Sequence, residues 1–274
     1  MTTLVIGARG SVGRQVLDEL MSAGEQVRAS VRDAASAGLP DGVPVVVADL
    51  TRPETLPAAL DGVRKVFLYC LPEGIDGFVK AATAAGVEHV VALSSGSVLL
   101  PEAAGNPIAE DHRLVEQALA DSGLRWTPVR PLVLANNALN WTHSIRADNF
   151  VRLVCADALA APVHERDIAA VAVAALLGAD DTSAVLTGPE LMTQRRQVEL
   201  IAQAAGRPIR VEALSPDQGR EHLRRFMPER LADAVVDILA ATTEGVVTDT
   251  AREVLGRAPV PFQQWAVEHA ADFR

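Results

Sequence analysis

The sequence is short of tyrosine, lysine and cysteine, and each shortage excludes a kind of chemistry. The single tyrosine, Tyr69, is followed at the fourth position by Glu73, so the chain contains no Tyr-x-x-x-Lys pair. The two cysteines, Cys70 and Cys155, fit no metal-binding spacing, and each is expected to be a buried small hydrophobic residue. The absence of Gly-x-Ser-x-Gly and of histidines paired at metal spacing argues against Ser/His/Asp hydrolysis and a helical metal site.

Long hydrophobic runs and excess positive charge are lacking too. No stretch approaches the roughly 18 consecutive apolar residues of a membrane-spanning helix, and the N-terminus enters a predicted strand without an apolar signal core. We therefore expect a cytoplasmic protein with no membrane partner. The net charge of −10 argues against a nucleic-acid partner, because binding to phosphates needs a basic face. A small organic substrate is the expected partner, and the sequence leaves the oligomeric state open.

A glycine-rich turn follows the first apolar run. Leu4–Ile6 is predicted to form a buried strand and Arg14–Ala23 a helix, with the spacing GxxGxxG between them. The free N–H groups and the positive dipole end of a helix N-terminus bind phosphate, and glycine lets the chain approach closely. An ordinary turn would look similar, but a second strand and an acidic residue follow at the distances of a βαβ unit. The predicted pyrophosphate contacts are Gly7, Ala8, Arg9, Gly10, Ser11, Val12 and Gly13.

Apolar segments alternate with helical ones through residue 131. Further strands, expected to be buried on both faces, are predicted at Val27–Val31, Val43–Val47, Lys65–Cys70, His89–Leu93 and Arg125–Val129. Helices are predicted between them, at Glu54–Leu60, Ile75–Ala85 and Glu110–Ser122. This alternation predicts an α/β fold of the Rossmann type, a doubly wound parallel sheet with right-handed crossovers.

The pattern loosens after residue 131. The sequence predicts a helix at Asp167–Leu177, a short strand at Ala184–Leu186, a helix at Gln197–Ala205 and a largely helical remainder with turns at Pro216, Pro228 and Pro259–Pro261. We expect residues 1–131 to form the dinucleotide-binding domain, with residues 164–187 returning to it. Residues 132–163 and 188–274 are expected to form a smaller lobe that covers the substrate.

The residue types after the second strand bear on the choice between the two nicotinamide cofactors. An acidic side chain there binds the ribose hydroxyls of NAD, whereas a cation favours the 2′-phosphate of NADP. Arg32 follows the strand and Arg9 projects toward it from the glycine turn, so NADPH is the predicted cofactor. Asp33 is expected to point away or to pair with an arginine, and Arg32 is also compatible with a solvated strand end.

Other cofactor contacts are predicted from their position directly after strands, because ligands bind beyond the carboxyl ends of a parallel sheet. These residues are Asp49, Leu50, Leu71, Pro72 and Pro131. The Asp49 carboxylate suits the exocyclic amine of adenine, and it is nearly as compatible with a turn or helix cap. Tyr69 is assigned to the sheet core or to the wall of the cofactor site.

Several motifs together resemble an NmrA-like atypical short-chain dehydrogenase/reductase. They are the glycine turn Gly7–Gly13, the strand Val27–Arg32, Leu93-Ser94-Ser95, Val115–Leu119 with Ser122-Gly123, Thr127–Pro131, His164–Ala169, Leu186–Pro189 and Ala205–Ile209. The resemblance covers nearly the whole chain. It implies a Rossmann domain with a smaller C-terminal lobe and, most often, NADPH as the cofactor. The family contains quinone and ketone reductases and also redox-sensing regulators that catalyse nothing.

The resemblance leaves the proton donor open, because the usual Tyr-x-x-x-Lys pair is missing. Aligning the Val115-Glu116 pair puts Ile108 at the tyrosine position and His112 at the lysine position. His112, Ser94 and Ser95 are therefore the candidate catalytic residues, with water or the substrate as alternative donors. His112 also suits binding to the cofactor ribose or an exposed helix face, and the two serines also suit local backbone contacts.

Polar and aromatic residues follow the sixth strand, where the resemblance puts the substrate cleft. Asn136, Asn137, Trp141 and His143 are the candidate substrate contacts, although a loop packed on the second lobe explains each singly. His164 and Asp167 are expected to cap the next helix. The sequence thus predicts an NADPH-dependent reductase of a carbonyl or quinone-like substrate, in secondary metabolism. The alternative is a non-catalytic NADP(H)-sensing regulator that binds a partner protein.

Overall fold

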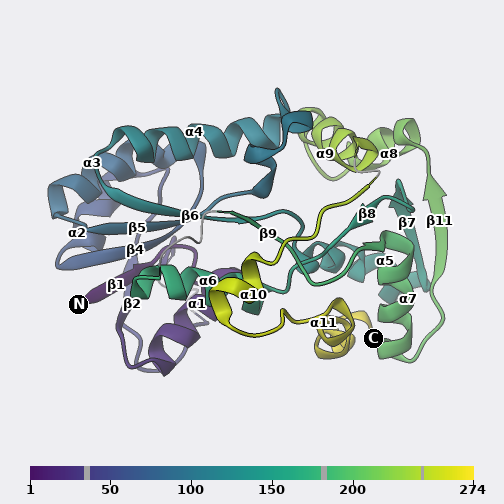
Figure 1. The fold of residues 1–274 in the computed structure, drawn as a ribbon, viewed down its shortest axis with the longest axis horizontal. Coiled ribbons are helices and arrows are strands. Elements are labelled where there is room, and N and C mark those ends of the chain that lie inside the picture. Colours follow the sequence, from purple (N-terminus) through teal and green to yellow (C-terminus); the bar gives the residue numbers. More distant parts are fainter. Residues whose placement is uncertain (34–37, 180–183, 242–243) are drawn as a thin grey trace.

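The computed structural model describes residues 1–33, 38–179, 184–241 and 244–274. Its central feature is a seven-stranded sheet in the order β3-β2-β1-β4-β5-β6-β9, in which every neighbouring pair is parallel (Figure 1). The strands are β1 (Thr2–Val5), β2 (Gln26–Val31), β3 (Val45–Val47), β4 (Val63–Tyr69), β5 (His89–Leu93), β6 (Arg125–Pro131) and β9 (Val185–Leu186). The predicted Rossmann-type fold is confirmed.

Helices cover both faces of this sheet. One face carries α1 (Ser11–Ser22) and α6 (Glu165–Leu177), whose buried side chains share a core cluster with Phe67 of β4. The other face carries α2 (Leu56–Leu60), α3 (Ile75–Ala85) and α4 (Pro107–Asp121) around a second cluster that contains Phe78. Short 3-10 helices join these elements: η2 (Pro53–Thr55), η3 (Pro72–Gly74), η4 (Gly96–Leu99) and η5 (Pro101–Ala103).

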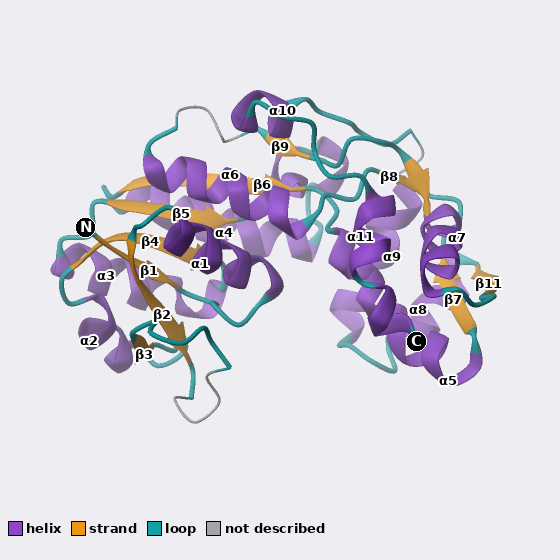
Figure 2. Cartoon of the chain, turned by 90° about the horizontal axis from the view of Figure 1, so that it is seen from below, coloured by secondary structure: helices purple, strands orange, loops and turns teal. Residues whose placement is uncertain are grey.

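The rest of the chain forms a second group of elements beside the sheet, seen on the right in Figures 1 and 2. Its strands pair in twos, β7 with β11 in parallel and β8 with β10 in antiparallel. A third core cluster, centred on the fully buried Trp265, lies in this part. The elements are η6 (Ala135–Trp141), α5 (Thr142–Asp148), β7 (Phe150–Val154), β8 (Leu159–Ala160), β10 (Met192–Thr193), α7 (Gln194–Ala205), β11 (Arg210–Leu214), α8 (Pro216–Leu223), α9 (Glu229–Ala241), α11 (Phe262–Glu268) and η7 (Ala270–Phe273). The helix α10 (Thr250–Leu255) instead packs on the sheet side, since its Ala251 belongs to the core cluster that contains Phe67.

Two expectations about strands are wrong. The remainder after Ala205 is not all helical, because β11 pairs with β7 along five residues. Its sequence, Arg-Val-Glu-Ala-Leu, lacks the apolar run by which the other strands were predicted, because much of β11 faces solvent. The expectation that the strands are buried on both faces is wrong for β3, although it suits β4 and β5 better. The strand β3 lies at the edge of the sheet and leaves Val45 and Val47 38% exposed. Pro216 begins α8 behind the capping residue Ser215.

A polar cluster joins the start of α6 to the C-terminal segment. His164 caps α6 as predicted, since its Nδ1 accepts a hydrogen bond from the Arg166 N–H at 3.1 Å. Asp167 does not cap the helix. Its carboxylate instead accepts hydrogen bonds from Arg257 Nη1 at 2.7 Å and from the Val260 N–H at 2.6 Å. These contacts hold the chain's last helices against the sheet. The predicted domain boundaries stay a prediction.

Within the described residues, every helix falls short of the length and hydropathy that crossing a bilayer requires. The cysteines differ from each other. Cys70 is buried, as predicted, whereas Cys155 is half-buried in the turn after β7, where its φ is +52°. That backbone conformation is uncommon outside glycine, so Cys155 serves a turn and is not the buried hydrophobic residue expected.

Candidate functional site

The glycine turn between β1 and α1 has the shape that a pyrophosphate site needs. Gly7 has a φ of +84°, which favours glycine, and its carbonyl accepts a hydrogen bond from the Gly10 N–H at 2.9 Å. A Cβ on Gly13 would lie 2.2 Å from that same carbonyl oxygen, so only glycine lets the helix start so close to the strand. No described side chain caps α1 at Gly10, which leaves its N-terminal N–H groups free for an anion.

The other residues of the turn divide into buried and exposed positions. Ala8 and Val12 are buried in the core beneath the turn, so their predicted cofactor contacts would use the backbone. Arg9 and Ser11 are exposed on the outer side of the turn. This division fits a site in which backbone N–H groups face the phosphates and the apolar side chains hold the loop in place.

Tyr69 lies at the rim of the glycine turn. The Cβ of Tyr69 is 3.1 Å from the position that a Cβ on Gly7 would take, and its side chain is 56% exposed. The expectation that Tyr69 belongs to the sheet core is therefore wrong, because the last residue of β4 points out beyond the sheet. Its other expected place, the wall of the cofactor site, stays a prediction.

The carboxyl ends of β2 and β3 carry the residues expected at the adenosine end of the cofactor. Arg32 is exposed directly after β2. Asp49 forms a turn, because its Oδ1 accepts hydrogen bonds from Thr51 N at 3.0 Å and Thr51 Oγ1 at 2.8 Å. Chiefly the hydroxyl of Thr51, together with Arg52, lowers the pKa of Asp49. The turn alternative foreseen for Asp49 is thus present, and its contact with adenine stays a prediction.

The remaining predicted cofactor residues lie along the same edge. Leu50 is buried against Gly74, and a Cβ on Gly74 would lie 2.5 Å from both the Cβ and the carbonyl oxygen of Leu50. Pro72 begins η3 after β4, with the half-buried Leu71 before it. Pro131 ends β6 and pairs in register with Leu186 of β9. The structure therefore brings these residues to the edge where the glycine turn lies, as the parallel sheet requires.

Ser94 belongs to a buried polar network beyond β5. Its Oγ donates a hydrogen bond to Oε1 of Glu116 at 2.6 Å, and Glu116 also accepts from Arg130 Nε at 2.8 Å and Nη2 at 2.6 Å. The Glu116 and Arg130 side chains are only 13% and 14% exposed. The bidentate pair was not identified from the sequence. The available signal was the residue types and their positions, because Glu116 comes four residues after His112 in a predicted helix and Arg130 directly follows a predicted strand.

The two other candidate catalytic residues are Ser95, next to Ser94 in the chain, and His112, on the same helix as Glu116. Ser95 caps η4 through its Oγ, which lies 2.8 Å from the Ser97 hydroxyl. His112 lies on α4, one turn before Glu116, and its buried Nδ1 has no hydrogen-bond partner among the described residues. Burial lowers the pKa of His112, while Glu116 and Asp111 act in the opposite direction. His112 is therefore the candidate whose side chain still has unused hydrogen-bonding capacity.

The four predicted substrate residues lie in η6 and in the first turn of α5, and their side chains have different surroundings. Asn136 Oδ1 accepts a hydrogen bond from the buried Trp265 Nε1 at 2.7 Å, which joins η6 to α11. Trp141 packs on the same core, as the alternative of a packed loop foresaw. Asn137 and His143 are exposed, and His143 lines a shallow depression of about 390 Å³ with Thr142, Arg146 and Ala147.

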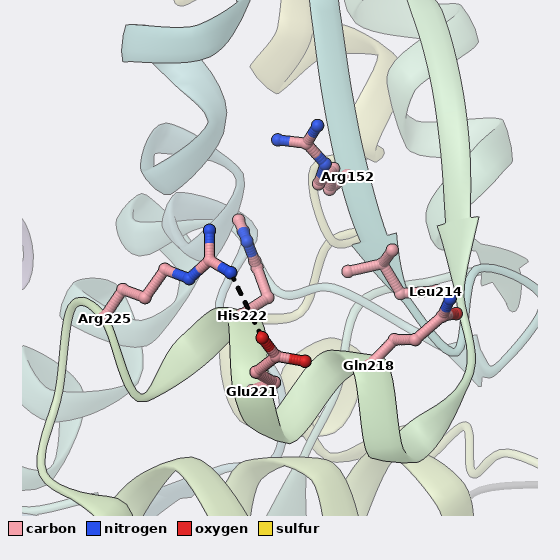
Figure 3. A pocket seen from close by; sticks show the side chains of 6 residues that line it. All are labelled: Arg152, Leu214, Gln218, Glu221, His222 and Arg225. Carbon is pink, nitrogen blue, oxygen red and sulfur yellow. Dashed lines mark hydrogen bonds and ion pairs between the residues drawn. The ribbon is translucent and has the colours of Figure 1, made fainter.

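A second depression, of about 220 Å³, lies between the β7–β11 pair and α8 (Figure 3). It is lined by Arg152, Leu214, Gln218, Glu221, His222 and Arg225. Its charges are compensated locally, since Arg225 pairs with Glu221 at 3.4 Å and Arg152 with Glu212 at 2.9 Å. The β7–β11 pair lies at the right-hand end of the molecule, away from β1 and α1, which flank the glycine turn (Figure 1), so this depression is separate from that turn.

The profile of a family described as NAD(P)H-binding matches residues 7–179. The chain is 37% identical to (4-alkanoyl-5-oxo-2,5-dihydrofuran-3-yl)methyl phosphate reductase of Streptomyces griseus, over 98% of each protein. It is 34% identical to the NAD(P)H azoreductase of Xenophilus azovorans, again over 98% of each. Among solved structures, an NADPH complex of an NADPH-dependent quinone oxidoreductase from Escherichia coli aligns with a TM-score of 0.82 at 24% identity, covering 98% of this chain and 99% of that one.

Proposed function

This chain belongs to the NAD(P)H-binding family, and from that premise we propose that it is a reductase that uses NADPH to reduce a carbonyl or quinone-like organic molecule. The membership confirms the resemblance to NmrA-like atypical short-chain dehydrogenase/reductases and the prediction of a nicotinamide dinucleotide. Full-length similarity to two enzymes that are named as reductases supports catalysis over the non-catalytic sensor.

The observation that carries the proposal is the glycine turn. Its uncapped helix N-terminus, the φ of Gly7 and the forbidden Cβ at Gly13 are all features that phosphate binding explains. Preference for NADPH over NADH rests on Arg32 and Arg9, which would meet the 2′-phosphate with charge-assisted hydrogen bonds. When bound, the dinucleotide supplies a hydride from C4 of its nicotinamide.

The chain's own residues would position the substrate and deliver the proton. Ser94 is engaged with Glu116, so we assign it to holding the end of β5 and not to proton transfer. His112 has a free hydrogen-bonding capacity one helical turn away from Glu116, so it is the side chain best able to donate to the substrate oxygen or to hold the ribose. Positioning would supply most of the rate, because the usual tyrosine acid is absent.

The substrate is proposed only at the level of its class. The two enzymes of about one-third identity are named for a furanone methyl phosphate and for azo compounds, so relatives of this fold reduce different groups. The place in secondary metabolism stays a prediction from the sequence.

The proposal is tested by fluorescence titration with NADPH and NADH, followed by an absorbance screen for NADPH oxidation. The screen includes quinones, ketones, azo dyes and furanone phosphates. We expect tighter binding of NADPH and oxidation with at least one of these acceptors. Tight binding of NADPH without its oxidation by any of the four classes would favour the non-catalytic sensor over the reductase. Failure to bind either nucleotide would overturn the cofactor assignment.

A further inference from the structure

Arg52 lies at the edge where the adenosine end of the cofactor is expected, although it is 20 residues after Arg32 in the sequence. The Ala48 N–H bonds the Val31 carbonyl at 3.0 Å and so continues the pairing of β3 with β2. The turn that follows brings Arg52 back across the end of β2, where its Nη2 lies 3.5 Å from the Arg32 carbonyl oxygen.

The Arg52 backbone is held in place from both sides. Its N–H bonds the Asp49 carbonyl at 2.9 Å, and its own carbonyl accepts from Thr55 Oγ1 at 2.8 Å and Thr55 N at 3.0 Å. Leu50, in the same turn, is anchored in the core against Gly74. Because the turn is fixed, little conformational freedom remains to be lost when the side chain meets a ligand.

The guanidinium group of Arg52 is oriented by its neighbours but keeps part of its hydrogen-bonding capacity. Asp49 Oδ2 accepts from Arg52 Nε at 3.2 Å, and Thr51 in turn fixes Asp49. Arg52 Nη1 has no partner among the described residues, and the side chain is 51% exposed. An arginine that is held through Nε and Nη2, and whose Nη1 has no partner among the described residues, can present that outer nitrogen to a phosphate.

We propose that Arg52 is a specificity-determining residue of the nucleotide site, which binds the 2′-phosphate of NADP(H) together with Arg32. The inference rests on the proposed use of NADPH. It explains why Asp49 is followed three residues later by an arginine that it holds by a single nitrogen. It also assigns Asp49 to positioning Arg52 through the fixed turn, in addition to any contact with adenine.

The alternative role for an arginine here is stacking on the adenine ring, which does not distinguish the two cofactors. The 2′-phosphate is present in NADP and absent from NAD. The small molecule 2′,5′-ADP carries it on adenosine without the nicotinamide half of the cofactor. Binding of these three ligands therefore separates the two roles. If Arg52 contacts the 2′-phosphate, its replacement must weaken the binding of NADP and 2′,5′-ADP only. If Arg52 stacks on adenine, its replacement must weaken the binding of NAD as well.

The experiment measures dissociation constants of NADP, NAD and 2′,5′-ADP by calorimetry for the wild type, Arg52→Ala and Arg52→Lys. Arg64→Ala serves as a matched control, because Arg64 is also about half exposed and paired with one carboxylate, at the amino-terminal end of β4. For Arg52→Ala we expect NADP and 2′,5′-ADP to bind about ten-fold to a hundred-fold more weakly. NAD should change less than about two-fold, and Arg52→Lys should lie between.

The outcomes separate this inference from the proposed function. If the wild type prefers NADP and Arg52→Ala binds all three ligands as the wild type does, the role of Arg52 is overturned while the NADPH proposal stands. Equal weakening for NADP and NAD would overturn it in favour of stacking. A wild type without preference for NADP would overturn both. Circular dichroism and the melting temperature of each variant report whether the fold is kept, and Arg52→Lys supplies the answer if the alanine variant unfolds.

Discussion

Ser94 Oγ and Glu116 Oε1 are 2.6 Å apart, although one follows β5 and the other lies in the middle of α4. The serine hydroxyl has a single hydrogen, and in this contact it is donated to a carboxylate that Arg130 also holds. This contact is the ground on which we propose that Ser94 supports the site and does not transfer the proton.

The first prediction concerns Ser94→Ala. The change removes a hydrogen bond to a charged acceptor that is only 13% exposed, so we expect the free energy of unfolding to fall by about 1–3 kcal/mol. Turnover should stay within a few-fold of the wild type. Denaturant unfolding and NADPH oxidation measure the two effects, and Ser95→Ala provides the neighbouring control. A loss of turnover of about a hundred-fold at unchanged stability would show that Ser94 is the donor after all.

The second prediction concerns His112→Phe, which separates its two possible roles. If His112 donates the proton, kcat should fall with little change in the dissociation constant of NADPH. Activity of the wild type should then also fall with rising pH through the imidazole pKa, which burial sets below its ordinary value of 6.5. If it holds the ribose, the dissociation constant should rise and the pH profile should stay as it was.

Steady-state kinetics across pH and a nucleotide titration of the same variant settle the choice. His222→Phe is a suitable control, because His222 lies by the depression at α8 and its pKa is also lowered by burial. Unchanged turnover together with unchanged nucleotide affinity in the His112 variant would remove His112 from the site.

A third prediction compares two glycines of the same turn. A Cβ on Gly13 would stand 2.2 Å from the Gly7 carbonyl oxygen, whereas one on Gly10 would stand 3.3 Å from it. The nearer contact is with backbone that cannot move without displacing β1 from α1. Gly13→Ala should therefore lower the melting temperature and weaken NADPH binding far more than Gly10→Ala. Similar behaviour of both variants in thermal unfolding and titration would show that the close approach is not required.

The fourth prediction concerns pH and the contact between His269 Nε2 and Glu165 Oε1, which are 3.0 Å apart. The contact raises the pKa of His269 above 6.5, so its contribution is complete below 6.5 and is lost as pH rises through the raised value. Burial raises the pKa of Glu165, but the hydrogen bond with His269 and the neighbouring imidazole of His164 outweigh it and lower this pKa from 4.5 to about 2. That contribution is complete above 4.5 and is lost as pH falls toward 2.

The stability difference between wild type and His269→Gln reports on His269 and its two carboxylate partners, Glu165 and Asp272, whose Oδ2 lies 2.8 Å from His269 Nδ1. It cancels groups that titrate equally in both proteins, among them His89, whose pKa burial lowers to about 4. We expect the difference to be largest between pH 4.5 and 6.5 and to shrink on either side. Urea unfolding at several pH values measures it. A difference that grows steadily with pH would contradict the assignment of a protonated His269.

The parallel sheet could be predicted because its strands are apolar and separated by helices of regular periodicity. Ile75–Ala85 has the predicted bounds, since Gly86 in a left-handed conformation ends the helix. β11 was missed because it pairs with a strand some 60 residues away and exposes charged side chains. Local periodicity contains no information on such a partner.

In the candidate site, too, features that depend on local sequence could be predicted and contacts with distant segments could not. Residues at the ends of buried strands, such as Arg32 and Asp49, could be placed from topology alone. The partner that each side chain finds depends on how loops fold back, which neither residue type nor spacing fixes. The sequence did not reveal that Asn136 Oδ1 accepts a hydrogen bond from Trp265, 129 residues later in the chain, and its contact with a substrate stays a prediction. Arg52 was overlooked for the same reason, because the turn at Asp49 brings it to β2.

The exposed phenol beside Gly7 gives this chain a built-in spectroscopic reporter. Tyr69 is the only tyrosine, so biosynthetic incorporation of fluorotyrosine would place a single fluorine nucleus at the rim of the glycine turn. Its NMR signal would need no assignment and would sense an arriving nucleotide through the local change in shielding. Slow or fast exchange of that one resonance would then give the residence time of the nucleotide, with no substitution in the turn itself.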